Sequence, residues 1–167
     1  SDDSILSAQN GRETAVRQGA KFYFAKQGTH FKVGEFEITI LSAFEDFEEN
    51  NRSLFVMAKI GGIKFLFTGD AQKSAELRLL DENLNLDCDV LKVAHHGSST
   101  STSKKFLRAT TPDYAVISVG ENNEYSHPSI QALTAIKEQK ATIYRTDQCG
   151  DITFYVENGK INVNTEK

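Results

Sequence analysis

Three segments that resemble buried strands each lead into a residue of a type that binds metal ions. Asp70 directly follows "IKFLFTG", and the pair His95 and His96 directly follows "CDVLKVA". His127 comes shortly after "YAVISVG" and immediately before a proline. In open α/β sheets, ligands bind at the carboxyl ends of strands. Since carboxylates and neutral imidazoles are common ligands of zinc and similar ions, these strand ends predict one convergent metal site.

The residue types suggest separate roles within such a site. The carboxylate of Asp70 has two oxygens and can bridge two divalent cations. Adjacent histidines at a strand end point in different directions, so one can bind metal while its neighbour faces substrate. His127, at a helix N-terminus, can stay neutral and donate a hydrogen bond to a developing oxyanion. Gly97 and Ser98 open the stretch "GSSTSTS", whose backbone N–H groups and hydroxyls can wrap an anionic substrate.

Each of these residues also has an ordinary structural explanation. Asp70 can cap a helix that begins at Ala71. The histidine pair can lie in an exposed polar loop, and His127 can be a capping or packing residue. The stretch 50–53, "NNRS", can reach the same site or simply form the loop before a strand. His30 is expected in a solvated turn.

Length and composition fit a single α/β domain over residues 1–167. The chain is 39% hydrophobic and 25% charged, which is typical of a globular domain. Its net charge of −4 gives no basic footprint for general nucleic-acid binding, although a local groove could still hold phosphates through metals. Cys88 and Cys149 are too few for a disulfide framework, so we expect free thiols. No apolar run reaches transmembrane length.

The elements that must position the site follow a mixed order. Helices are predicted over 4–19, 71–80, 104–110 and 128–138, with Ser103 capping the third and Pro128 in the first turn of the fourth. Strands are predicted over 21–25, up to Leu41, on both sides of a Gly61-Gly62 hairpin turn, and over 88–94, 114–120, 141–146, 151–156 and 160–164. An acidic loop is expected before residue 53. This order predicts a mixed sheet with flanking helices, and no Rossmann glycine fingerprint follows the first strand.

The chain resembles the metallo-β-lactamase-like hydrolase domain of the ComEC competence-protein type. The resemblance is carried by "NNRSLFVMAKIGGIKFLFTGDAQKSAE", "CDVLKVAHHGSSTSTSKKFL", "PDYAVISVGENNEYSHPS" and "IYRTDQCGDI", and it extends from about Lys21 to Gly159. It implies an αββα sandwich, of which this chain would be the second half. It also implies a two-metal hydrolase centre with zinc or manganese.

The same resemblance implies roles for individual residues. Asp70 matches the bridging carboxylate and His96 matches a metal ligand. His95 matches a contact to the substrate or the transition state, although the roles of the two adjacent histidines could be reversed. His127 matches the histidine of the family's "GHP" element. Asn51 lies near the place where many members supply another histidine, so that ligand is absent or replaced here. We expect Asn51 to contact the substrate.

The chain departs from the family pattern in its first half. Nothing in it matches the HxHxDH motif that supplies most metal ligands, and Ser126 replaces the usual glycine before His127. The chain therefore resembles the C-terminal half of such a domain, as a fragment, a processing product or a truncated relative. It could be without metal by itself. We expect apolar surface that pairs with a missing N-terminal half or with a second copy of the chain.

The resemblance implies a metal-dependent hydrolase that acts on phosphodiesters, with single-stranded DNA as the expected substrate in competence and DNA uptake. It suggests a place on the extracellular face of the membrane or secretion. Activity is expected in the full-length context, with little or no turnover by this chain alone. The alternative is a non-catalytic binding or scaffold module that keeps the fold without a metal centre. A phospho-acceptor domain modified at Asp70 fits less well, since "KFYFAKQG" offers no acidic pair.

Overall fold

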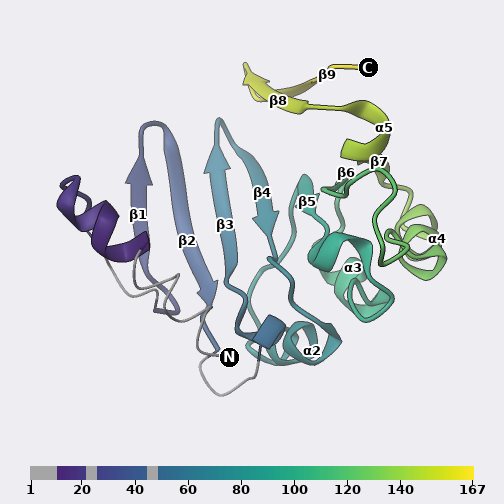
Figure 1. The fold of residues 1–167 in the computed structure, drawn as a ribbon, viewed down its shortest axis with the longest axis horizontal. Helices are drawn as coiled ribbons and strands as arrows, with labels where there is room; N and C mark the ends of the chain where they lie inside the picture. The colour runs from purple at the N-terminus through teal and green to yellow at the C-terminus, as the bar shows by residue number, and fades with distance from the viewer. Residues whose placement is uncertain (1–10, 22–25, 45–48) are drawn as a thin grey trace.

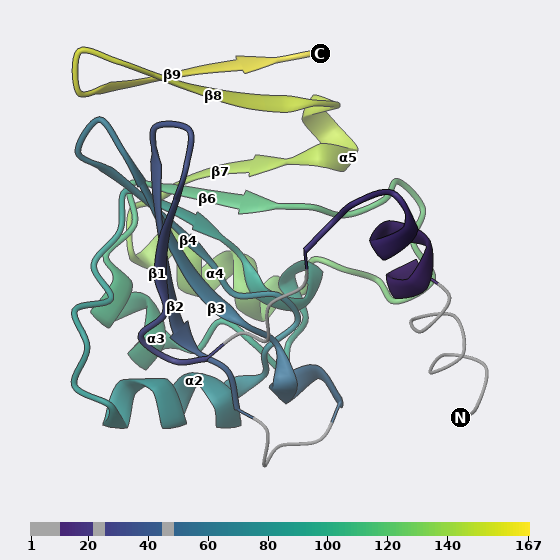
Figure 2. The same cartoon turned by 90° about the vertical axis from the view of Figure 1, so that its left-hand side faces the viewer.

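A computed structural model describes residues 11–21, 26–44 and 49–167 and shows a layered α/β domain (Figure 1). Seven strands form one sheet in the order β1-β2-β3-β4-β5-β6-β7, and β8 and β9 form a separate hairpin. Helices α2, α3 and α4 lie on one face of the large sheet, and the β8–β9 hairpin lies over the other (Figure 2). The predicted mixed α/β architecture with flanking helices is therefore confirmed.

The bounds of the elements follow the sequence patterns closely. The strands are β1 His30–Val33, β2 Phe36–Ser42, β3 Phe55–Ile60, β4 Ile63–Phe67, β5 Val90–Lys92, β6 Tyr114–Ile117, β7 Thr142–Arg145, β8 Ile152–Glu157 and β9 Lys160–Thr165. The helices are α2 Lys73–Asp81, α3 Lys104–Thr110, α4 Ile130–Glu138 and the single turn α5 Thr146–Cys149, with 3₁₀ turns η1 Glu49–Arg52 and η2 Ala94–Gly97. Residues 11–17 are also helical.

The direction of the strands explains how one edge of the sheet gathers functional groups. Strands β1 to β4 pair antiparallel, and β3 and β4 are joined by the predicted Gly61-Gly62 turn, where both glycines have positive φ. Strands β4, β5, β6 and β7 pair parallel. Because parallel strands have their carboxyl ends at the same edge, the segments after β4, β5 and β6 meet there.

The core lies between the sheet and its helices. Leu66 and Leu91 from the central strands are almost fully buried there, together with Leu79 of α2, Phe106 of α3 and Ile136 of α4. Side chains alternate along each strand, so neighbours such as Phe65 and Val90 face the β8–β9 side instead. Burial on both faces explains why the central strands appear as continuous apolar runs.

Two helix starts differ from their predicted positions. Helix α4 begins at Ile130, because Ser129 is its N-cap and accepts a hydrogen bond from the Ala132 N–H at 3.2 Å. The prediction that Pro128 lies in its first turn is therefore wrong. Helix α2 begins at Lys73, two residues later than predicted. In contrast, Ser103 caps α3 as predicted.

The predicted strand that ends near Leu41 proved to be the second strand of a hairpin. Gly34, with a φ of 57°, lies in the turn between β1 and β2. His30 is thus the first residue of β1 and not a turn residue, although its side chain is exposed as expected. Residues 22–25 of the predicted strand, residues 4–10 of the predicted first helix and residues 45–48 of the acidic loop lie outside the described part of the chain.

Large apolar side chains remain exposed on the described surface, as expected. They include Phe31, Val33, Phe36 and Phe67, which are between 41% and 59% exposed. They lie on β1, β2 and β4 of the large sheet. The partner that would cover such surface stays a prediction. Among the described residues, no helix has the length and apolar character needed to cross a membrane.

Candidate functional site

The structure brings the four candidate site side chains together at the C-terminal ends of β4, β5 and β6. Asp70 follows β4, His95 and His96 lie in η2 after β5, and His127 lies in the loop between β6 and α4. The ring centroids of His95 and His96 are 6.3 Å apart, and those of His95 and His127 are 5.8 Å apart. The sequence interpretation of one convergent site therefore agrees with this arrangement.

Asp70 and His96 form a close pair of metal-type ligands. Nε2 of His96 lies 3.7 Å from Oδ1 of Asp70, and both side chains are about half exposed. Nδ1 of His96 donates to the carbonyl oxygen of Ser118 at 2.7 Å. Because a carbonyl can only accept, this bond places the proton of a neutral ring on Nδ1 and leaves Nε2 as a lone-pair donor facing Asp70.

Asp70 does not serve as a helix cap. The N-cap of α2 is Gln72, whose N–H donates to Oδ1 of Asn51 at 3.0 Å. The backbone N–H of Asp70 donates to the hydroxyl of Ser53 at 2.9 Å. Gly69 precedes it with a φ of 52°, and a Cβ there would lie 2.8 Å from Ser53. The chain after β4 is thus held in place by its backbone, and the carboxylate points toward the histidines.

The histidine pair is displayed by an unusual backbone. His95 and His96 have φ values of 48° and 54°, and Gly97 follows at 80°. Left-handed conformations in residues with a Cβ persist only where the surroundings enforce them, and they cluster at functional sites. Here the N–H of His95 donates to the Gly69 carbonyl at 3.1 Å, and the Ser129 N–H donates to the Gly97 carbonyl at 2.8 Å.

Asn50 is a site neighbour that the sequence interpretation did not single out. Its Nδ2 lies 3.5 Å from Nε2 of His95. Nδ1 of His95 is buried and has no hydrogen-bond partner among the described residues. Asn51, predicted to contact substrate, instead uses its side-chain oxygen to hold the start of α2. The stretch 50–53 does reach the site, through Asn50 and Ser53.

His127 has the neutral character expected of it, but for a different reason. Burial lowers its pKa, and the neighbouring His95 and His96 lower it further. Helix α4 begins three residues later, at Ile130, so His127 lies before its first turn. A lowered pKa keeps the imidazole neutral at pH 7, so one ring nitrogen carries a proton that it can donate.

The hydroxyl-rich stretch after the histidines surrounds a carboxyl group of the chain itself. The carboxylate of Glu76 is fully buried and accepts hydrogen bonds from the backbone N–H groups of Thr102 and Ser103. Burial nevertheless raises its pKa. Ser98, predicted to bind substrate, is buried and shares a hydrogen bond with Thr100 at 3.0 Å. Gly97 is also buried. The part that Gly97 and Ser98 play in substrate binding stays a prediction.

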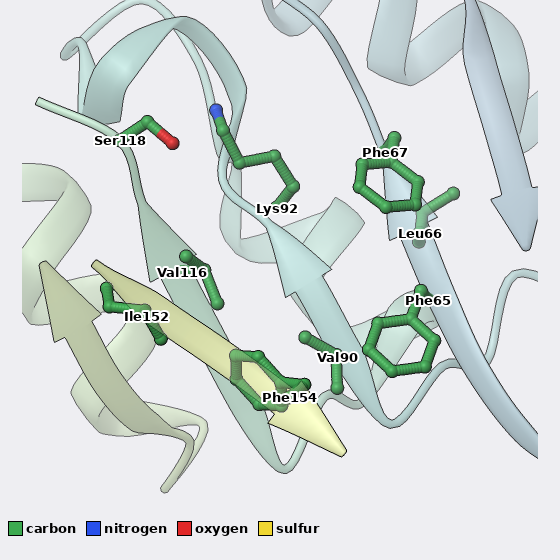
Figure 3. Close-up of a pocket in the computed structure, with 9 residues that line it drawn as sticks. All are labelled: Phe65, Leu66, Phe67, Val90, Lys92, Val116, Ser118, Ile152 and Phe154. Carbon is green, nitrogen blue, oxygen red and sulfur yellow. The ribbon is translucent and has the colours of Figure 1, made fainter. Parts of the chain in front are cut away.

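An apolar cavity of about 370 Å³ lies between the large sheet and β8 (Figure 3). Phe65 and Val90 of the large sheet and Phe154 of β8 line its apolar part, and Lys92 and Ser118 form its polar end. The amine of Lys92 donates to the Val93 carbonyl at 3.0 Å. Burial lowers the pKa of this amine, while the charge of Asp70 raises it. In the sequence, the lysine that interrupts the apolar run "DVLKVA" could have pointed to Lys92.

The described residues fit two positions of a metal shell. Asp70 and His96 supply an oxygen and a nitrogen whose separation suits a shared ion, and the second ring nitrogen of His96 has the carbonyl partner typical of metal-binding histidines. In the described part of the chain there is no group of three or more His, Cys, Asp or Glu residues that could hold an ion. Catalytic zinc sites generally use three protein ligands, so this pair by itself falls short of such a site.

Comparison with known proteins agrees with the fold. Residues 50–121 match the metallo-β-lactamase superfamily. The chain is 32% identical over 159 residues to ComE operon protein 3 of Bacillus subtilis (strain 168), which covers 94% of this chain and 20% of that protein. It is 32% identical over 145 residues to competence protein ComA of Neisseria gonorrhoeae, covering 86% of this chain and 21% of the relative.

A third relative is recombination protein 2 of Haemophilus influenzae (strain ATCC 51907 / DSM 11121 / KW20 / Rd), 31% identical over 126 residues, covering 75% of this chain and 15% of the relative. The chain thus spans about a fifth or less of the length of these three proteins. The mixed seven-stranded sheet, its helices and the matched segment define a metallo-β-lactamase-type domain. Within that class, the chain resembles the competence proteins of the ComEC type, as its sequence predicted.

Proposed function

We propose that this chain forms the histidine-rich part of a metal-dependent hydrolase site that acts on phosphodiesters of the nucleic-acid type. The observation that supports it most directly is the Asp70–His96 pair. Its two ligand atoms are 3.7 Å apart, and its imidazole is oriented by the Ser118 carbonyl. The similarity to competence proteins favours nucleic acid as the substrate class.

In this proposal, Asp70 and His96 hold a divalent cation, zinc or manganese. Such an ion supplies Lewis-acid stabilisation of negative charge on a phosphoryl oxygen. The remaining ligands would come from another polypeptide segment or from a second copy of the chain. We therefore expect little or no turnover from this chain by itself.

The other residues of the site act on the anionic substrate. Neutral His127 donates a hydrogen bond to a non-bridging phosphate oxygen, where charge increases during attack. His95 lies between His127 and His96, and in this proposal its ring is a further contact to the same group. Lys92 places a positive charge near Asp70 at the polar end of the cavity. Together these groups favour a phosphate over an uncharged ester.

Metal titration of the purified chain tests the first half of the proposal. We expect weak binding of Zn²⁺ or Mn²⁺, measured by calorimetry, that is lost in Asp70→Ala and in His96→Ala. His30→Ala is the matched control, since that exposed histidine lies on β1, outside the site. Metal binding that is unchanged in both site variants, or the absence of metal binding to the wild-type chain, would overturn the assignment of these ligands.

Binding of a short single-stranded DNA oligonucleotide tests the second half. We expect His127→Ala and His95→Ala to weaken it, because each removes a ring that contacts the phosphate in this proposal, while His30→Ala leaves it unchanged. A loss of roughly 10- to 150-fold corresponds to one hydrogen bond to a charged group. Failure of the wild-type chain to bind the oligonucleotide would argue against a phosphodiester substrate.

A non-catalytic binding or scaffold module is the second candidate. It is favoured by the observation that the described residues supply only two closely placed metal-type ligands. This candidate predicts oligonucleotide binding that is the same with and without added metal, and the same in Asp70→Ala. Binding that increases with metal in the wild-type chain alone would favour the hydrolase site instead.

A further inference from the structure

Tyr125 is a large aromatic side chain that lies exposed beside the site. It is 77% exposed, and its ring stacks on that of His127 with centroids 5.8 Å apart and planes inclined by 22°. One face of the ring is therefore supported by a site residue while much of the side chain remains open to solvent. Exposing an aromatic ring is unfavourable, so such a ring beside a polar site suggests a ligand that covers it.

The loop that carries Tyr125 is held in one shape by Asn123. Nδ2 of Asn123 donates to the carbonyl of His127 at 2.7 Å and to that of Gly120 at 3.2 Å. Its Oδ1 accepts from the N–H of His127 at 2.9 Å. These bonds close the loop on both sides of Tyr125. The ring is thus presented by a preorganised turn, which reduces the entropy lost when a ligand binds.

Tyr125 also begins a row of rings that leads to the candidate metal ligands. Its ring stacks on His127, whose ring makes an edge contact with His95, whose ring in turn makes an edge contact with His96. The far end of this row lies at Asp70. A ligand stacked on the open face of Tyr125 would therefore lie close to His127, which is proposed to bind the phosphate.

We propose that Tyr125 is a stacking platform for one nucleobase of a single-stranded nucleic acid whose adjacent phosphodiester lies at His127. This inference rests on the proposed function and adds to it the part of the substrate that gives binding beyond the phosphate. Every nucleobase has a flat π-face, so the platform favours single-stranded nucleic acid over simple phosphodiesters without selecting a base sequence.

Two oligonucleotides of equal length and charge separate base stacking from phosphate binding. One is oligo-dT and the other is an abasic strand with the same sugar-phosphate backbone, and both carry a fluorophore for anisotropy measurements at one fixed salt concentration. The chain is compared with Tyr125→Ala and Tyr125→Phe. Tyr155→Ala is the matched control, because Tyr155 is an exposed tyrosine on β8.

We expect Tyr125→Ala to weaken oligo-dT binding by roughly 5- to 150-fold, the range for loss of one base–aromatic stack. Binding of the abasic strand should stay unchanged. Tyr125→Phe keeps the ring and should bind oligo-dT nearly as well as the wild-type chain. Tyr155→Ala should bind both strands as the wild-type chain does.

Other outcomes overturn the inference in distinguishable ways. If Tyr125→Ala binds both strands as tightly as the wild-type chain, or binds both equally weakly, the ring does not hold a base, and phosphodiester binding by the site still stands. Equal weakening would show that the ring supports the loop. If the wild-type chain binds neither strand, the proposed phosphodiester substrate is lost together with the stacking platform.

Discussion

Nε2 of His96 lies 3.7 Å from Oδ1 of Asp70, although the two residues follow different strands of the sheet. Parallel pairing of β4 with β5 brings the strand ends together, but it does not by itself orient the His96 ring toward Asp70. The orientation of the ring is set by the left-handed backbone of His95, His96 and Gly97 and by the hydrogen bond to the Ser118 carbonyl. The geometry of this pair should therefore be sensitive to changes in the turn.

Gly97→Ala should destabilise the chain and displace the histidine pair. A Cβ at Gly97 would lie 2.6 Å from Cβ of Pro128, and the residue has a φ of 80°. Strain and overpacking together predict a loss of about 2–4 kcal/mol, measured by urea unfolding. Gly120→Ala is the control, because a Cβ there meets nothing within 4 Å and its φ is not positive. Equal stability of the two variants would contradict the close packing of this turn.

Glu76→Ala should destabilise the chain more than Glu76→Gln. Alanine leaves two buried backbone N–H groups, those of Thr102 and Ser103, without acceptors, which predicts a loss of about 2–4 kcal/mol. Glutamine keeps one acceptor oxygen and should lose about half as much. Glu138→Gln is the control, because that exposed carboxylate only pairs with Lys104 at the surface. Urea unfolding of the three variants at pH 7 provides the comparison, and equal effects of the two Glu76 variants would argue against the buried anion.

The titration of Glu76 should also give stability a defined pH dependence. Burial raises the pKa of Glu76 above its ordinary value of 4.5 in the folded chain. The folded state then holds the proton more tightly than the unfolded state. Its contribution to stability is fully present below pH 4.5 and is lost as pH rises through the higher folded pKa. The stability of the wild-type chain relative to Glu76→Gln should fall across that interval, and a rise would contradict the assigned direction.

Much of the fold could be predicted because its local signals agree with one another. The Gly61-Gly62 pair between two apolar runs marks a hairpin, and Ser103 before an apolar helix marks a cap. Pro128 misled the prediction because proline and serine both suit a helix start. Only the observed hydrogen bond from Ala132 to Ser129 shows that the serine is the cap.

The members of the site could be predicted, but their surroundings could not. Residue type and strand order identify Asp70 and the histidines, since parallel strands share one edge. The role of Asn50 depends on which of two adjacent side chains turns inward, and no local pattern determines that. The hydroxyl-rich stretch was predicted to bind substrate. The group that it binds in the structure is the side chain of Glu76, which lies on a distant helix and could not be linked to this stretch from the sequence.

Cys88 should resist thiol reagents in the folded chain. It is 2% exposed, and burial, followed by the charges of Asp87 and Asp89, raises its pKa to about 12. At pH 8 almost none of it is thiolate, the reactive form. Titration with Ellman's reagent should therefore detect no rapid reaction in a Cys149→Ser variant until denaturant is added. Fast labelling of that variant without denaturant would show that the segment before β5 opens readily.

Phe154→Ala should loosen the β8–β9 hairpin from the large sheet. The Phe154 ring makes edge contacts with Phe65, Tyr114 and Tyr144, with centroids between 5.8 and 6.1 Å away. Loss of these contacts predicts about 1–3 kcal/mol less stability for the docked hairpin. Amide hydrogen exchange should accelerate in β8 and β9 while the core strands stay protected, because the hairpin would open as a local unit. Tyr155→Ala, on the exposed face of β8, should leave exchange unchanged, and similar exchange in both variants would mean that these ring contacts do not hold the hairpin.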